Sequence, residues 1–310
     1  EMFKMASSFN GDISEWTVSR VEEMHSMFAY AESFNQDVST WDVSNVRTMD
    51  RMFWHAASFR HKLCGTAWLN SKASKKGMFT GSPAGLSQSI CTVLSSNAEL
   101  LRAVRKCLQL SPQGDCADGP HGTIAEWDVS RITNMENVFA EAHSFNEDIS
   151  DWYVSSVITM SAMFAHARSF NGDLSKWRVS RVVSMPRMFM RATSFNGDLS
   201  KWDVSSVTDM GRIFGWAAAF DADISKWDVS SVTKMANMFM GAVNFNSDIS
   251  KWDVSRVENM HGMFGQAPAF TAWQRRFART PAFNSVISEW DVSSVTDMST
   301  MFKGAKAFAG

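Results

Sequence analysis

A 25-residue period runs through most of the chain and constrains its fold more than any other feature. Tryptophan marks the period at Trp16, Trp41, Trp127, Trp152, Trp177, Trp202, Trp227, Trp252 and Trp290. Two intervals exceed 25 residues, and they imply insertions of 61 residues after Trp41 and 13 residues after Trp252. A unit this short cannot bury an apolar face alone, so successive units must stack.

The consensus of one unit, F-N-x-D-[IL]-S-x-W-x-V-S-x-V-x-x-M-x-x-M-F-x-x-A, has two halves. In the second half, apolar residues such as Val46, Met49, Phe53 and Ala56 follow helical spacing, and Ser44 precedes them as an N-cap. The first half alternates apolar and polar residues over a length that suits a short strand. The sequence therefore predicts an α/β solenoid, a leucine-rich-repeat-like stack of about nine units, each with a short strand, a turn and a short helix.

The residue usage indicates that a few interior positions are multiplied many times. The chain holds 23 Phe, 21 Met and 13 Trp but only two Tyr. We expect the Trp column and two Phe columns to form buried ladders, in which each side chain packs against its copies in adjacent units. An Asn follows the first Phe in most units, for example at Asn171 and Asn196, and its amide can satisfy backbone groups at the bend.

The repeat FNxDISxWDVSxVTxMxxMF resembles that of the BspA-like surface-protein family, which is found in bacterial surface lipoproteins and expanded in protists and algae. The resemblance covers about 230 of the 310 residues. It implies a scaffold for cell-surface adhesion and protein–protein contact. It transfers no catalytic residue to this chain.

All four cysteines, Cys64, Cys91, Cys107 and Cys116, fall between residues 60 and 122, outside the repeats. An even number confined to the one non-repetitive segment predicts two disulfides. We favour Cys64–Cys91 with Cys107–Cys116, because these pairs close short loops. Free thiols and a zinc site are the alternatives, although no C-x-x-C pair supports zinc. Disulfides would place the protein in an extracytosolic, oxidising compartment: the cell surface, the outside of the cell or an organelle lumen.

The departures from the period divide the chain into three parts. Residues 1–59 form a first repeat array, 60–122 a cysteine-containing insertion, and 123–310 a second array with a basic loop at 271–282. Within the insertion, Ser96 and Glu99 form a capping box before an amphipathic helix, which we expect to cap the second array. One continuous array with a looped-out insertion is the alternative. Both ends fall within a repeat, so we expect the first array to be truncated.

Two surface features are candidates for partner binding. The loop at 271–282 combines arginines with aromatic residues: Trp273, Arg275, Arg276, Phe277 and Arg279. The residue before Trp is lysine in four successive units, at Lys176, Lys201, Lys226 and Lys251. Either feature would bind an acidic partner or surface. The alternative is that the loop folds onto the stack, and that the lysines form a solvated stripe paired with Asp173, Asp198, Asp223 and Asp248.

No nucleophile, base or phosphate-binding motif stands at a spacing that indicates catalysis, so the sequence predicts no enzyme, no cofactor and no metal. The net charge of −2 argues against nucleic acid as a partner, and no apolar run is long enough to span a bilayer. We expect a scaffold that contacts proteins, or a glycan or acidic surface, through one face or its basic loops. The alternative is a structural subunit built permanently into a larger multi-protein assembly, in an organelle lumen that allows disulfides.

Overall fold

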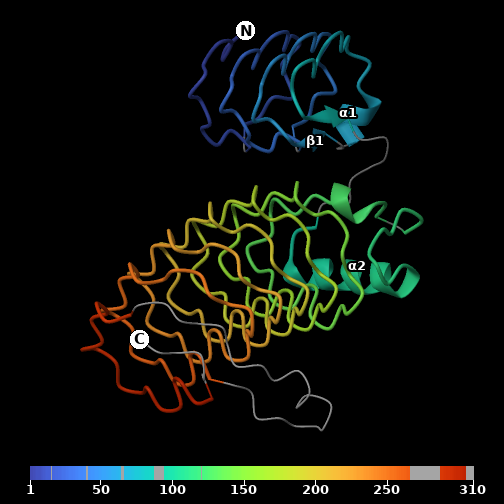
Figure 1. The fold of residues 1–310 in the computed structure, drawn as a ribbon. Helices are drawn as coiled ribbons and strands as arrows, with labels where there is room; N and C mark the ends of the chain where they lie inside the picture. The colour runs from blue at the N-terminus through green and yellow to red at the C-terminus, as the bar shows by residue number, and fades with distance from the viewer. Residues whose placement is uncertain are drawn as a thin grey trace. The chain divides into compact units, whose positions relative to one another are not determined.

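The computed structural model describes residues 1–14, 16–39, 41–63, 66–86, 94–119, 121–265 and 287–304. The chain forms two compact units, Glu1–Thr92 (unit 1) and Val93–Gly310 (unit 2). Within each unit, successive repeats lie side by side (Figure 1). Each unit also has its own hydrophobic core. The prediction that this is a repeat protein is therefore confirmed.

Main-chain hydrogen bonds join each repeat to the next. In the middle of unit 2, N–H groups donate to carbonyls of the following repeat over 2.7–3.1 Å, from Met185, Arg187, Phe189 and Arg191. One residue per repeat also forms a parallel bridge, in the order Asn134, Thr159, Ser184, Asp209, Lys234, Asn259 and Asp297. The bridging residue directly precedes the first Met of the motif. The ladder thus lies in the second half of the repeat, and the strand predicted for the F-N-x-D segment is wrong.

The helix predicted for the second half is also wrong, because in the described repeats this half consists of turns. Met188 N–H donates to the carbonyl of Met185 at 3.3 Å, and the following turn closes in the same way. The third residue of each turn is left-handed, with φ of 59° at Arg187 and 58° at Arg191. Pro186 stands second in its turn, where a fixed φ is favoured. Successive four-residue turns direct apolar side chains inward at intervals of three and four residues, which is also the spacing of a helix face.

The ladders of identical side chains form the core, as the sequence predicts. Phe189 stacks on Phe214 of the next repeat with 5.7 Å between ring centroids. The indole Nε1 of Trp202 donates to the carbonyl of Leu174 in the preceding repeat at 3.0 Å, and neighbouring repeats form the same bond. The side-chain oxygen of Asn171 accepts the N–H of its counterpart in the next repeat at 2.8 Å. Each column is therefore fixed by packing and by hydrogen bonds between repeats.

Unit 1 continues beyond residue 59, where the sequence places the end of the first array. Its indole donor shows this most directly: Trp68 bonds to a carbonyl of the preceding repeat at 3.1 Å, as Trp41 does. Trp68 lies in α1 (Thr66–Asn70), and nearby β1 (Lys62–Leu63) pairs in parallel with β2 (Gly85–Leu86). The interval of 27 residues between the two tryptophans and the loss of the surrounding motif hide this repeat in the sequence.

The amphipathic helix predicted after Ser96 is α2 (Asn97–Leu110), which lies along the first repeats of unit 2 (Figure 1). The Ser96 side chain accepts the N–H of Glu99 and caps the helix. The Glu99 carboxylate accepts from the backbone N–H and the hydroxyl of Ser95. The apolar face packs into the core of unit 2 through Leu100, Ala103, Val104 and Cys107.

α2 and the segment after it make the hydrogen bonds that a preceding repeat would make. Asn97 Nδ2 donates to the carbonyls of Asn134 and Glu136 at 3.1 Å each. The Asn146 N–H donates to the Gln113 carbonyl at 3.2 Å. Trp127 Nε1 donates to the Gly122 carbonyl at 3.0 Å. The two bonds of Asn97 replace backbone contacts between repeats, that of Asn146 replaces the Asn contact, and that of Trp127 replaces the Trp contact. The short helix η1 (Ile124–Glu126) then leads into the first repeat.

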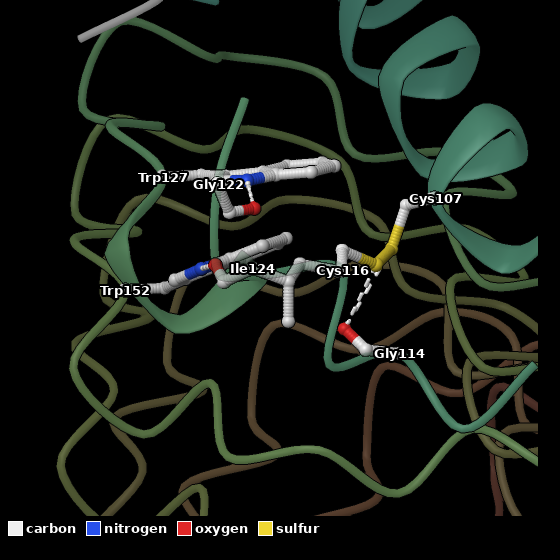
Figure 2. Close-up of a disulfide and its surroundings, with 7 residues drawn as sticks. All are labelled: Cys107, Gly114, Cys116, Gly122, Ile124, Trp127 and Trp152. Carbon is white, nitrogen blue, oxygen red and sulfur yellow. Dashed lines mark hydrogen bonds between the residues drawn. A yellow bond between two sulfur atoms is a disulfide. The ribbon is translucent and has the colours of Figure 1, made fainter. Parts of the chain in front are cut away.

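A disulfide joins Cys107 in α2 to Cys116 in the following loop (Figure 2). It holds that loop against the first repeat, where Gly114 adopts a φ of 109°. A side chain at Gly114 would clash, because its Cβ would come within 2.6 Å of the Phe145 ring. Cys64 and Cys91 lie outside the described residues.

Candidate functional site

The loop predicted to bind a partner, with Trp273, Arg275, Arg276, Phe277 and Arg279, lies outside the described residues. The lysine column lies within them. Its four lysines are exposed and occupy the same position in successive repeats: Lys176, Lys201, Lys226 and Lys251. Lys176 forms an ion pair with Asp151 at 2.9 Å. Among the residues the structure describes, no carboxylate lies within ion-pair distance of the other three ammonium groups.

The aspartates three positions before these lysines serve the backbone. Each accepts the N–H of the serine two residues on, at 2.8–2.9 Å, in turns that recur along the stack at Asp173, Asp198, Asp223 and Asp248. These serine bonds are the main reason that the pKa of each carboxyl is lowered, and the nearby lysine contributes less. The predicted pairing of each lysine with the aspartate of its own repeat is therefore not formed as an ion pair, since the acid is already bound to its turn.

A second set of surface residues comes from the left-handed turn positions, which sequence reasoning missed. In two adjacent repeats these positions hold Arg187, Arg191, Arg212 and Trp216, with φ between 57° and 59°. We call these four residues the arginine–tryptophan surface. A residue with a Cβ costs roughly 1–2 kcal/mol in this conformation, which glycine adopts freely. The next repeat follows that preference, with Asn237 and Gly241 at the equivalent positions.

The arginine–tryptophan surface is internally stacked. The guanidinium of Arg191 lies over the Trp216 ring, 5.2 Å from its centroid. The other face of the indole covers Gly241, where an added Cβ would come within 2.6 Å of Trp216 Cδ1. Glycine at 241 thus makes room for the indole. The ring is held between a cation and the backbone of the next repeat, and it stays partly exposed.

Unit 1 repeats this arrangement with other residues. Tyr30 and His55 occupy the same left-handed column and stack with 5.2 Å between centroids and 6° between planes. Gly81 follows them, and a Cβ there would come within 2.5 Å of His55 Nδ1. Beside this column, the Arg51 guanidinium lies 4.8 Å from the centroid of the Trp54 ring. Both units therefore carry aromatic and cationic side chains at or beside the left-handed turn positions. We call the surface formed by these positions the turn face.

The charged side chains of the arginine–tryptophan surface itself are all positive. No carboxylate among the described residues forms an ion pair with Arg187, Arg191 or Arg212. Two repeats earlier in the same column, Glu141 lies 3.6 Å from His166 Nδ1. Burial lowers the pKa of His166 most, Glu141 opposes this, and Arg191 lowers it further. Among the described residues, no group of three or more His, Cys, Asp and Glu side chains could hold a metal ion.

The sequence matches a family described as "Mycoplasma protein of unknown function, DUF285". The match covers residues 1–90, 115–221, 197–277 and 271–310, which is most of the chain. The chain belongs to this family. The overlapping segments agree with the repeats in the structure, and the resemblance of this DUF285 chain to BspA-like proteins stays a prediction. No curated protein matches it. In the described part of the chain, no helix has the length and apolar character needed to cross a membrane.

Proposed function

We propose that the chain is a non-catalytic repeat scaffold that binds other proteins through its turn face. The interior columns are nearly uniform from repeat to repeat, whereas the first left-handed position changes along unit 2, from Asn137 to Ala162, Arg187, Arg212 and Asn237. A constant frame with a varied exposed face is what recognition by repeat proteins requires.

The observation that carries the proposal is the set of side chains at those strained positions. Asparagine and glycine would satisfy the turns at lower cost, and other repeats use them. Arg191 and Trp216 stack on each other, whereas Arg187 and Arg212 form no ion pair with a carboxylate of the described residues that would offset the strain. Strained residues of this kind gather at functional sites, and Trp and Arg dominate the energy of protein interfaces.

Two finer features belong to the same proposal. We infer that each unit is a solenoid, and the bridges at one residue per repeat support this. We also infer an extracytosolic location, which the disulfide between Cys107 and Cys116 supports, because disulfides persist in oxidising compartments.

The test is site-specific photo-crosslinking in the cells that express the protein. A photoreactive amino acid replaces Arg212 on the turn face or, as the matched control, Ser206, which is exposed in the same repeat. We expect the probe at 212 to join the chain to a particular protein, and the probe at 206 to give no such product. Equal products from both positions, or none from 212, would contradict the proposal.

A separate measurement, made without crosslinking, distinguishes a reversible scaffold from a permanent subunit. A scaffold should release its partner at high salt and appear as free chain by size-exclusion chromatography, since exposed charge pairs are screened. A chain that stays in one large assembly under these conditions would favour the structural-subunit alternative.

A further inference from the structure

We infer that the arginine–tryptophan surface binds an acidic segment of a protein partner, an inference that rests on the proposed function. Its starting point is the fixed spacing of the four residues. Arg187 and Arg212 occupy one position of adjacent repeats, and Arg191 and Trp216 occupy another. Their own N–H groups donate to the following repeat at 2.7–2.9 Å. The backbone of every side chain on this surface is therefore held by a bond between repeats before any partner arrives.

The charge of the surface selects an anionic ligand. Three guanidinium groups belong to two adjacent repeats, whose bridged backbones lie about 5 Å apart along the stack. Among the described residues, none of these arginines has a carboxylate partner. Asp209, the acid among the bridging residues of these repeats, already accepts the N–H of Gly211 at 2.9 Å. Like charges this close repel one another, and carboxylates from outside the chain would relieve the repulsion.

The chemistry of the side chains favours carboxylates on a protein over other anions. A guanidinium binds a carboxylate through two parallel N–H bonds, which suits Asp and Glu side chains. Trp216 adds an indole ring that stays partly exposed, with the partly buried Met190 and Met240 in the adjoining position. An acidic segment that carries one apolar residue would use both parts of the surface.

A polynucleotide fits this surface less well. Binding to a phosphate backbone needs many positive groups along a continuous track. Here the positions on either side of Arg187 and Arg212 are neutral, at Ala162 and Asn237, and the other column, which holds Arg191, becomes acidic at Glu141. The positive surface thus spans only two repeats, a length that suits a peptide segment with a few carboxylates.

The experiment uses the full chain and a fluorescein-labelled twelve-residue peptide of Asp and Glu with one central Leu, followed by fluorescence anisotropy. The test variant carries Arg187→Asn, Arg191→Gly and Arg212→Asn, which introduce residues that other repeats hold at the same positions. The matched control carries Lys201→Asn, Lys226→Asn and Lys251→Asn, and so removes the same charge from another exposed column. Circular dichroism confirms that both variants are folded.

We expect the peptide to bind the unchanged chain and the lysine variant equally, and the arginine variant at least tenfold more weakly. The Asn/Gln version of the peptide should not bind. Equal losses in both variants, no binding of the acidic peptide, or preference for a heparin oligosaccharide or a twelve-nucleotide DNA strand would each overturn the inference. If position 212 still crosslinks to a protein in cells while the acidic peptide fails, the inference is wrong and the proposed function stands. If both experiments fail, both are wrong.

Discussion

Replacing Trp202 by Ala tests whether the ladders hold the stack together. Trp202 is 4% exposed and lies in the unbroken run of repeats in unit 2. Its ring centroid is 6.3 Å from that of Phe189 in the preceding repeat, and its indole N–H donates to Leu174. The substitution therefore removes packing with a neighbouring repeat and one of the two hydrogen bonds that the Leu174 carbonyl accepts, the other coming from the N–H of Trp177.

The expected cost follows from these two losses. Removing a buried tryptophan side chain costs about 3–5 kcal/mol of unfolding free energy, because the surrounding residues only partly fill the cavity. Of this, roughly 0.5–1.5 kcal/mol comes from the lost indole hydrogen bond, since the Leu174 carbonyl still accepts the N–H of Trp177. Trp202→Phe should separate the two contributions, since it retains an aromatic ring and loses only the N–H and part of the volume. Lys201→Ala, one residue away and exposed, should change stability by less than about 0.5 kcal/mol.

The assay is urea denaturation followed by circular dichroism, with unit 1 as an internal reference. Because the two units have separate cores, Trp202→Ala should shift the transition of unit 2 alone. Trp41→Ala, whose indole makes the same bond in unit 1, should shift the other transition by a similar amount. The reasoning is refuted if Trp202→Ala and Lys201→Ala have equal effects, or if Trp202→Phe costs as much as Trp202→Ala.

Four further predictions address the cap, the strained turns and the aspartate column. Reducing the Cys107–Cys116 disulfide should destabilise unit 2 by about 2.5 kcal/mol, the loop-closure value for a separation of nine residues, and a reduced protein with an unchanged urea midpoint would contradict this. Asn97→Ala removes two hydrogen bonds at the end of the stack and should cost about 1–2 kcal/mol, visible as faster amide exchange in the first repeat of unit 2. Arg187→Gly should stabilise unit 2 by about 0.5–1 kcal/mol, because relief of the left-handed strain exceeds the added chain entropy; a lower melting temperature would show that the arginine supports the fold. Acid should destabilise the stack: the folded pKa of Asp198 lies below its unfolded value near 3.9, so its stabilisation is present above about pH 4 and is lost as the pH falls. Asp198→Asn should therefore weaken the dependence of the melting temperature on pH between about 2 and 5, and an unchanged slope would exclude this role.

The sequence predicts the repeat, the buried columns and the helix that caps unit 2, because each depends on residue type at fixed spacing. The Trp, Phe and Asn ladders need only the period, and α2 has its own capping residue in Ser96. The conformation of the second half is not predictable from apolar spacing, since a helix and a pair of four-residue turns place apolar residues alike. The signal for turns instead of a helix comes from Gly241, Gly262 and Pro186, because glycine and proline are unfavourable in a helix interior.

The arginine–tryptophan surface could not be found before the turns were known. In a helix, Arg187, Arg191 and Arg212 would be ordinary exposed cations, and nothing would separate them from Lys201 or Lys226. The left-handed backbone distinguishes these arginines from the lysines, because any residue other than glycine has a conformational cost at these positions. Comparing repeats at these two positions, and noting where Gly or Asn gives way to a large residue, is the signal that would have identified the surface.

The same comparison explains why specificity in this fold must come from the turns. Interior columns cannot vary, since a changed Trp202 or Phe189 would no longer fit its copies in the repeats on either side. The column of Asp198 is committed to the backbone, since its carboxylate accepts the serine N–H that closes a bend. The left-handed positions are fixed in φ and ψ, and the side chains of Arg187, Arg191, Arg212 and Trp216 there stay at least partly exposed. A chain that keeps its core by repetition can therefore change its partner only where the exposed residues of one repeat differ from those of the next. In unit 2 the largest such difference lies in the pair of repeats that carries Arg187 and Trp216.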